Sequence, residues 1–373
     1  MKRFIHTLAL SLLGTLAACT GSSEEPTRAL LAAAINNPSS NTYQVRFFQS
    51  STLQPDNFDP PRRVGDWDFS EPIVALLYRR SLDPGINDQL WVLTPSHLRR
   101  YRTRNLSVDD VGTPQLDGFD QALNVDCGGG DLRQGPSRVL LVCPPATPAS
   151  PIEEYRAWLI PFTDSAPPAP VNFQDPKLAR LRPPVRLALG PNDQLLYLTP
   201  DLLGQYDLVN PFIERSLPSS LSTFSPTDLI FANGLALGLF DDNDPVTTDT
   251  TLATWNLSPT GEVGLVRDSS IAARFFARGA PPVFVLGSGL ARLEGGLQLP
   301  RERETGLSRF LSYSSATLGI DQFLYAAQQD SPSLVVIDLT VNIANALTST
   351  GVRFSPLGSF QERIRGLAFI PVE

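Results

Sequence analysis

The sequence predicts an all-β fold built from repeated four-stranded sheets, and three observations support this prediction. A nine-residue segment occurs twice, and short apolar runs alternate with turn residues along most of the chain. The 34 prolines and 26 glycines among 373 residues suit a fold with many tight turns. After the first 18 residues, no segment of 12 or more residues has convincing helical periodicity.

The repeated segment is Asn-Asp-Gln-Leu-Trp-Val-Leu-Thr-Pro at 87–95 and Asn-Asp-Gln-Leu-Leu-Tyr-Leu-Thr-Pro at 192–200, and its opening recurs as Asp-Gln-Phe-Leu-Tyr at 321–325. Other strand-like runs lie between these copies. Successive units are 39 to 56 residues apart when they are taken to start at Gln89, Arg138, Gln194, Leu235, Val283 and Gln322. That interval is typical of the four-stranded blade of a β-propeller.

The two ends of the chain supply complementary parts of one further blade. Residues 29–35 and 42–48 form a predicted hairpin with no strand before it, and residues 364–372 form a predicted strand with no hairpin after it. Pairing them would close the ring and remove its free edges. We therefore expect a single propeller domain over residues 29–373 with seven four-stranded blades, six or eight being the alternatives.

The N-terminus has the features of a secretory signal peptide: Lys2 and Arg3, an apolar run from Phe4 to Leu16, and small residues before Cys19. Leu16-Ala17-Ala18-Cys19 resembles the lipobox of bacterial lipoproteins. The resemblance implies that residues 1–18 are removed, that Cys19 is acylated, and that residues 19–28 form a short tether to a membrane. An ordinary signal peptide with an incidental cysteine is the alternative.

The blade pattern of residues 29–373 resembles bacterial seven-bladed propeller lipoproteins of YVTN or lactonase-like form, although Tyr-Val-Thr-Asn itself is absent. The resemblance implies a lipid-anchored, extracytoplasmic binding or scaffold module with an envelope protein or glycan as partner. In a Gram-negative cell, Thr20 in place of an aspartate after Cys19 favours the outer membrane by analogy with enterobacterial lipoproteins. The alternatives are a metal-dependent lactonase or esterase, and an assembly factor for outer-membrane proteins.

Export also bears on the remaining cysteines, Cys127 and Cys143. In an oxidising compartment such a pair is expected to form a disulfide, which here would bridge two strand-like runs, 123–127 and 139–143, around a glycine-rich connection. Two buried free thiols are the alternative. A metal site is disfavoured because no histidine lies near them.

The net charge of −8 argues against general attraction to nucleic acid. No cofactor is expected, with one alternative. Asp242 and Asp244 belong to an acidic cluster that could offer oxygen ligands to Ca²⁺, although the cluster lies where a hairpin turn is expected.

One basic stretch and one histidine remain as candidates for binding or chemistry. Strand alternation would place Arg100, Arg102 and Arg104 on one face, where they could bind phosphate, a carboxylate or an acidic partner. The favoured interpretation is a solvated outer strand balanced by Asp109 and Asp110. The single histidine of the mature chain, His97, follows the repeated Leu-Thr-Pro turn, so we expect a turn or surface residue and no catalytic residues.

Overall fold

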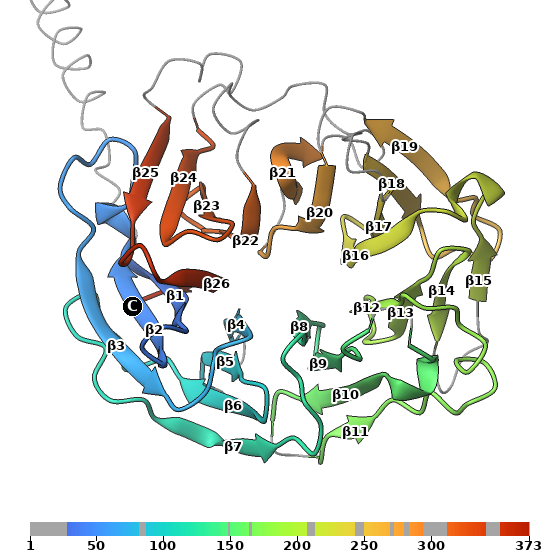
Figure 1. Ribbon diagram of the computed structural model, residues 1–373, viewed down its shortest axis with the longest axis horizontal. Helices are drawn as coiled ribbons and strands as arrows, with labels where there is room; N and C mark the ends of the chain where they lie inside the picture. Colours follow the sequence, from blue (N-terminus) through green and yellow to red (C-terminus); the bar gives the residue numbers. More distant parts are fainter. Residues whose placement is uncertain are drawn as a thin grey trace, which may run out of the picture.

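The computed structural model describes residues 28–81, 87–147, 150–163, 166–206, 213–242, 250–268, 272–279, 283–293, 312–340 and 351–372. In this part of the chain the strands form six four-stranded sheets and one two-stranded sheet, all antiparallel. The sheets follow one another around a ring in chain order (Figure 1). This arrangement is a β-propeller, so the predicted fold class is confirmed. Seven four-stranded blades are not confirmed, because one sheet has only two described strands.

The strands are given from the innermost to the outermost strand of each sheet. The first sheet contains β26 (Arg363–Pro371), β1 (Ala29–Asn37), β2 (Thr42–Gln49) and β3 (Arg63–Phe69). The second contains β4 (Ala75–Arg79), β5 (Gln89–Leu93), β6 (His97–Arg102) and β7 (Leu116–Ala122). The third contains β8 (Asp131–Gln134), β9 (Arg138–Cys143), β10 (Arg156–Pro161) and β11 (Ala169–Pro170).

The fourth sheet contains β12 (Arg186–Leu189), β13 (Leu195–Leu198), β14 (Leu202–Tyr206) and β15 (Ile213–Ser216). The fifth contains β16 (Ser225–Ala232), β17 (Leu235–Asp241), β18 (Thr250–Trp255) and β19 (Gly264–Asp268), and the sixth contains β20 (Ala272–Phe276) and β21 (Val283–Leu293). The seventh contains β22 (Tyr313–Leu318), β23 (Phe323–Gln328), β24 (Ser333–Asp338) and β25 (Val352–Pro356). The 3₁₀ helices of the described residues are η2 (Ser50–Thr52), η3 (Ile152–Glu154) and η4 (Ser219–Leu221).

The sequence repeat corresponds to one position in the sheets. The copies at 87–95, 192–200 and 321–325 contain or lead into β5, β13 and β23, each the second strand of its sheet. The other three predicted starts, Arg138, Leu235 and Val283, begin β9, β17 and β21, which are second strands as well. The spacing of the repeat in the sequence is therefore the number of residues from the second strand of one sheet to the second strand of the next.

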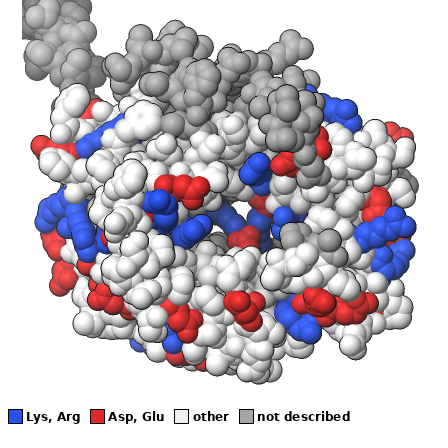
Figure 2. All heavy atoms as spheres, in the orientation of Figure 1, with Lys and Arg blue, Asp and Glu red and all other residues white. Residues whose placement is uncertain are grey.

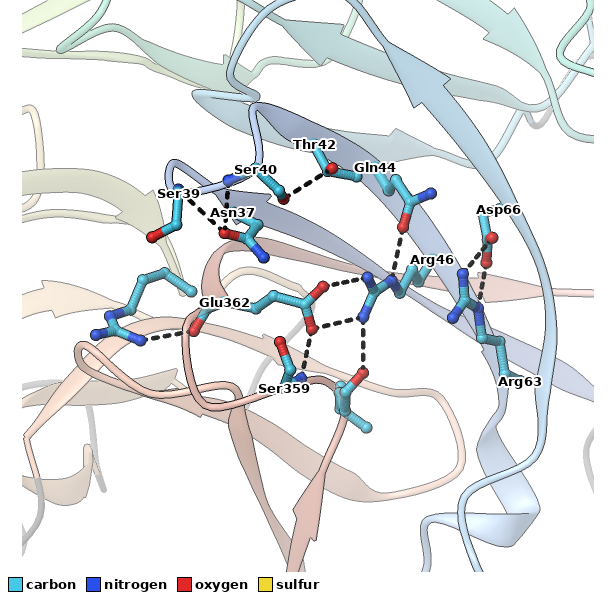
Figure 3. A network of polar contacts seen from close by, with 12 residues as sticks. Asn37, Ser39, Ser40, Thr42, Gln44, Arg46, Arg63, Asp66, Ser359 and Glu362 are labelled. Carbon is cyan, nitrogen blue, oxygen red and sulfur yellow. Dashed lines mark hydrogen bonds and ion pairs between the residues drawn. The ribbon is translucent and has the colours of Figure 1, made fainter.

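The two ends of the chain close the ring as predicted. β26 pairs with β1 in antiparallel register, with Leu30 opposite Ile370 and Ala32 opposite Ala368. Arg46 on β2 forms a buried ion pair with Glu362, which immediately precedes β26 (Figure 3). Both side chains are less than one-tenth exposed. Backbone pairing and a buried charge pair thus join the N-terminal hairpin to the C-terminal strand.

The core lies between the sheets, where a cluster of buried apolar side chains fills each junction between neighbouring sheets of the ring. β1 explains why the sequence of an inner strand is apolar throughout. Leu30 and Ala32 pack toward the sheet of β4–β7, while Leu31 and Ala33 pack toward the sheet of β22–β25. Successive side chains of a strand point to opposite faces, so a strand covered on both faces must be apolar at every position.

Candidate functional site

The innermost strands of the sheets surround a polar cavity of about 330 Å³ on the axis of the ring. Basic and acidic side chains surround the central opening (Figure 2). The charged residues that line the cavity come from five sheets: Asp131, Arg133, Arg186, Asp228, Arg278 and Arg365. Apolar residues in and just before the innermost strands, among them residues 74–76, Val185 and Leu187, complete the wall.

Four of these residues form an ion-pair network that crosses the channel. Arg133 on β8 contacts both Asp131, at 2.6 Å from Nη2 to Oδ2, and Asp228 on β16. Arg278, just after β20, contacts Asp131 at 2.5 Å from Nη2 to Oδ1. The side chains of Arg133 and Asp228 are only 12% and 2% exposed. In the ring, the sheet of β12–β15 lies between the sheet that contains β8 and the sheets that contain β16 and β20 (Figure 1). These contacts therefore join sheets that are not neighbours in the ring.

Backbone groups complete the environment of the two carboxylates. Asp228 accepts hydrogen bonds from the backbone N–H of Leu229, at 2.8 Å, and of Phe276, at 2.7 Å. Burial opposes ionisation of Asp131, but the guanidinium groups of Arg133 and Arg278 outweigh it and hold the pKa of that carboxyl below its usual value. Both aspartates are therefore engaged by arginines or N–H donors.

The arginines of the cavity exceed its carboxylates. Within the network, burial and the like charge of Arg133 lower the pKa of Arg278. The excess comes from Arg186 and Arg365, which lie outside the network. Arg186 donates from Nε to the carbonyl of Pro226 at 3.1 Å and has no carboxylate partner among the described residues. Arg365 on β26 is exposed and makes no hydrogen bond or ion pair in the described part of the chain.

The sequence analysis missed these residues, and one signal could have found them. Asp131, Arg133, Arg186 and Arg365 are charged residues in first strands of the repeat, where the neighbouring residues are apolar. Only the propeller geometry shows that first strands from different units converge on one axis. Arg133 and Asp228 are 95 residues apart along the chain, and Asp131 and Arg278 are 147 residues apart.

Arg100 and Arg102 on β6 both meet Asp117. Arg100 is buried, with Nε 3.2 Å from Asp117 Oδ2, and it also donates to the carbonyl of Phe162 at 3.0 Å. Arg102 lies 2.9 Å from Asp117 Oδ1 through Nε. Arg104 lies beyond the end of β6 and is exposed, so strand alternation does not extend to it.

Asp109 and Asp110, expected to balance the charges of Arg100, Arg102 and Arg104, have other partners in the structure. Asp109 pairs with Arg62 at 2.9 Å, and Asp110 accepts a hydrogen bond from the backbone N–H of Gly112 at 2.8 Å. The carboxylate opposite the arginine stretch is Asp117, on the paired strand β7. A bulge between Arg100 and Tyr101 shifts the register of β6 against β7. Such an irregularity cannot be placed from the sequence pattern.

His97 is the first residue of β6 and lies beside a serine and a glutamate. Its Nδ1 is 2.7 Å from Ser96 Oγ and 3.9 Å from Glu71 Oε1. Ser96 Oγ also donates a hydrogen bond to Glu71 Oε1. In a catalytic triad the imidazole lies between the hydroxyl and the carboxylate. Here the serine lies between the other two groups, and the backbone N–H of His97 bonds to Thr94 Oγ1 at 3.1 Å within the turn. The arrangement is that of a polar turn.

The expected calcium ligands cannot be compared fully with the structure. Asp242 directly follows β17, whereas Asp244 lies outside the described residues. Within the described ranges, no three His, Cys, Asp or Glu side chains are grouped so that they could hold a metal ion. Cys19, the signal segment 1–18 and nearly all of the tether 19–28 also lie outside the described part. No helix of that part has the length and apolar character needed to cross a bilayer.

Cys127 and Cys143 form a disulfide, with their Cα atoms 4.8 Å apart. Cys143 is the last residue of β9, as expected for a strand, but residues 123–127 form no strand. Cys127 lies in the connection before β8, and the bond ties that connection to the β8–β9 hairpin. Both residues are buried in the core between this sheet and that of β4–β7.

No known family model and no curated protein sequence matches this chain. Solved structures do share its fold. Apo AztD from Citrobacter koseri is 10% identical, with 92% of this chain and 97% of that chain covered and a TM-score of 0.52. The β-propeller domain of Cps50 (Swd1) from Myceliophteria thermophila is 12% identical, with 77% and 87% covered and a TM-score of 0.52. At these identities the likeness shows the fold alone.

Proposed function

We propose that this protein is a lipid-anchored, extracytoplasmic β-propeller that acts as a binding module of the cell envelope, with the central channel as its binding site. The cross-channel ion-pair network carries the proposal. Arg133, Asp131, Asp228 and Arg278 fix the walls of a polar cavity, and a cavity with fixed polar groups binds at a low cost in ordering.

The fold supports the same role. A closed ring is rigid, and its loops and inner strand ends present side chains from many sheets to a single axis. The proposal includes a seventh blade at the two-stranded sheet of β20 and β21, which would make the ring complete. The step from fold to function is analogy, and the channel supplies its physical basis.

The anchor is tested by replacing the acylated residue. Cys19→Ser removes the sulfur that would carry the lipid, so we expect the variant to leave the membrane fraction and enter the soluble extracytoplasmic fraction. Cys127→Ser serves as the cysteine control and should remain in the membrane fraction. Equal membrane partition of wild type and Cys19→Ser would contradict the anchor.

The binding role is tested by purification from chemically crosslinked envelopes. The anchored wild-type protein should carry a specific crosslinked partner, and a matched lipoprotein of unrelated fold should not carry it. Recovery of the protein without any such partner would count strongly against a binding or scaffold module.

A further inference from the structure

The charge of the channel is opposite in sign to the charge of the chain. The whole protein has a net charge of −8. The cavity nevertheless has four arginines and two aspartates in its wall: Asp131, Arg133, Arg186, Asp228, Arg278 and Arg365. An excess of charges of one sign in a cleft with walls of low dielectric concentrates the electric field, so such a cleft attracts ions of the opposite sign.

Among the described residues, two of the four guanidinium groups have no carboxylate partner. Arg133 and Arg278 are held by Asp131 and Asp228 in the cross-channel network. Arg186 uses only Nε, on a backbone carbonyl, and in the described part of the chain no acceptor is bonded to its Nη atoms. Arg365 has no bonded acceptor there at all, although it lies in the cavity wall.

A guanidinium group binds oxyanions with particular geometry. Its N–H donors form a planar fork that matches two oxygens of a carboxylate or phosphate, and such charge-assisted hydrogen bonds are stronger than neutral ones. The engaged carboxylates cannot rotate to neutralise Arg186 or Arg365, because arginines and backbone N–H groups already hold their oxygens. The unpaired N–H donors in the cavity thus suit an anion from solution, whose oxygens would accept their hydrogen bonds.

We propose that the channel binds a small oxyanion, a carboxylate or a phosphate, on the guanidinium groups of Arg186 and Arg365. This inference names the ligand chemistry of the channel and rests on the channel being the binding site proposed above. The ligand is either a free anion or an anionic group at the end of a larger partner. The cavity volume of about 330 Å³ is at the lower end of the range of small-molecule sites, so it has room for the anion and a small group attached to it.

The test is calorimetric titration of the folded, disulfide-bonded protein with inorganic phosphate and, separately, with succinate at low ionic strength. We expect saturable binding of at least one of them, weakened by added sodium chloride. Arg365→Gln should weaken that binding about tenfold or more, because one charge-assisted contact is lost. Since Arg365 bonds to no residue in the part of the chain that the structure describes, thermal unfolding of this variant should match that of wild type, so a loss of binding would not reflect a loss of folding.

Two further variants separate the channel from general charge effects. Arg186→Gln should also weaken binding, whereas Arg182→Gln should not, because Arg182 is 80% exposed and lies outside the cavity wall. Absence of saturable binding of both anions, or an equal effect of Arg182→Gln and Arg365→Gln, would overturn the proposal. In that case a partner recovered from crosslinked envelopes would still support the binding module, so the two proposals fail separately.

Discussion

Removing the carboxylate of Glu362 should strongly destabilise the closure of the ring. Arg46 and Glu362 join β2 to the segment before β26 across 316 residues of sequence (Figure 3). In Glu362→Ala, Arg46 keeps only the carbonyl of Leu357, at 3.3 Å, and the amide oxygen of Gln44, at 2.9 Å. Breaking a buried ion pair from one side leaves an uncompensated charge and costs about 3–5 kcal/mol.

The assay is equilibrium unfolding in urea at neutral pH with the disulfide intact. Glu154→Ala is the control, because Glu154 is exposed, and its free energy of unfolding should stay within about 0.5 kcal/mol of wild type. In a double variant, Arg46→Met with Glu362→Leu, most of the stability should return, since replacement of both charges leaves neither one buried alone. An unchanged free energy of unfolding in Glu362→Ala would refute the reasoning. So would a double variant as unstable as the sum of the single variants.

The same pair predicts a pH dependence. Burial raises the pKa of Glu362, but Arg46 and the backbone N–H of Ser359 outweigh it, so the pKa in the folded protein lies below the usual value. A carboxyl group with a lowered folded pKa contributes stability above its unfolded pKa, and the contribution is lost as pH falls through the folded pKa. Below about pH 4.5, the stability difference between wild type and Glu362→Gln should therefore shrink.

Three further predictions concern other parts of the ring. Replacing both Cys127 and Cys143 by serine should lower the free energy of unfolding by about 3 kcal/mol in urea titration, because the bond closes a 16-residue separation; an equal stability with and without reductant would contradict this. Burial raises the pKa of Asp321 to about 6, so its stability contribution is present below the unfolded pKa and is lost as pH rises through about 6. Asp321→Asn should then raise the free energy of unfolding at pH 8 by about 1–3 kcal/mol. A lower free energy of unfolding at pH 8, or an equal change at pH 4 and pH 8, would refute that sign. Gly287→Ala should destabilise the sheet of β20 and β21, because the added Cβ would lie 2.0 Å from the carbonyl oxygen of Ala272; circular dichroism melting that matches wild type would contradict it.

The sequence predicted the parts of the fold that depend on local patterns. The repeat at 87–95 and 192–200 marked the second strand of its sheet, and the apolar ends 29–35 and 364–372 predicted their own pairing. These features could be found because strand alternation and turn residues act over a few positions.

The site could not be predicted in the same way. Arg133 and Asp228 are 95 residues apart, and nothing local in either segment indicates that the two strands face one channel. The arginine stretch at 100–104 was noticed because its charges are adjacent, yet Arg100 and Arg102 meet a structural partner in Asp117. The isolated arginines of the innermost strands, which carry the proposed function, gave no cluster in the sequence.

The central claim, that the channel is where this protein binds, is tested most directly by photo-crosslinking in intact cells. A photoreactive amino acid would replace Ser314, an exposed residue of the cavity wall, or Phe360, which is 88% exposed and outside that wall. The account predicts a specific adduct from position 314 and none from position 360. No adduct from position 314, or equal adducts from both positions, would contradict it.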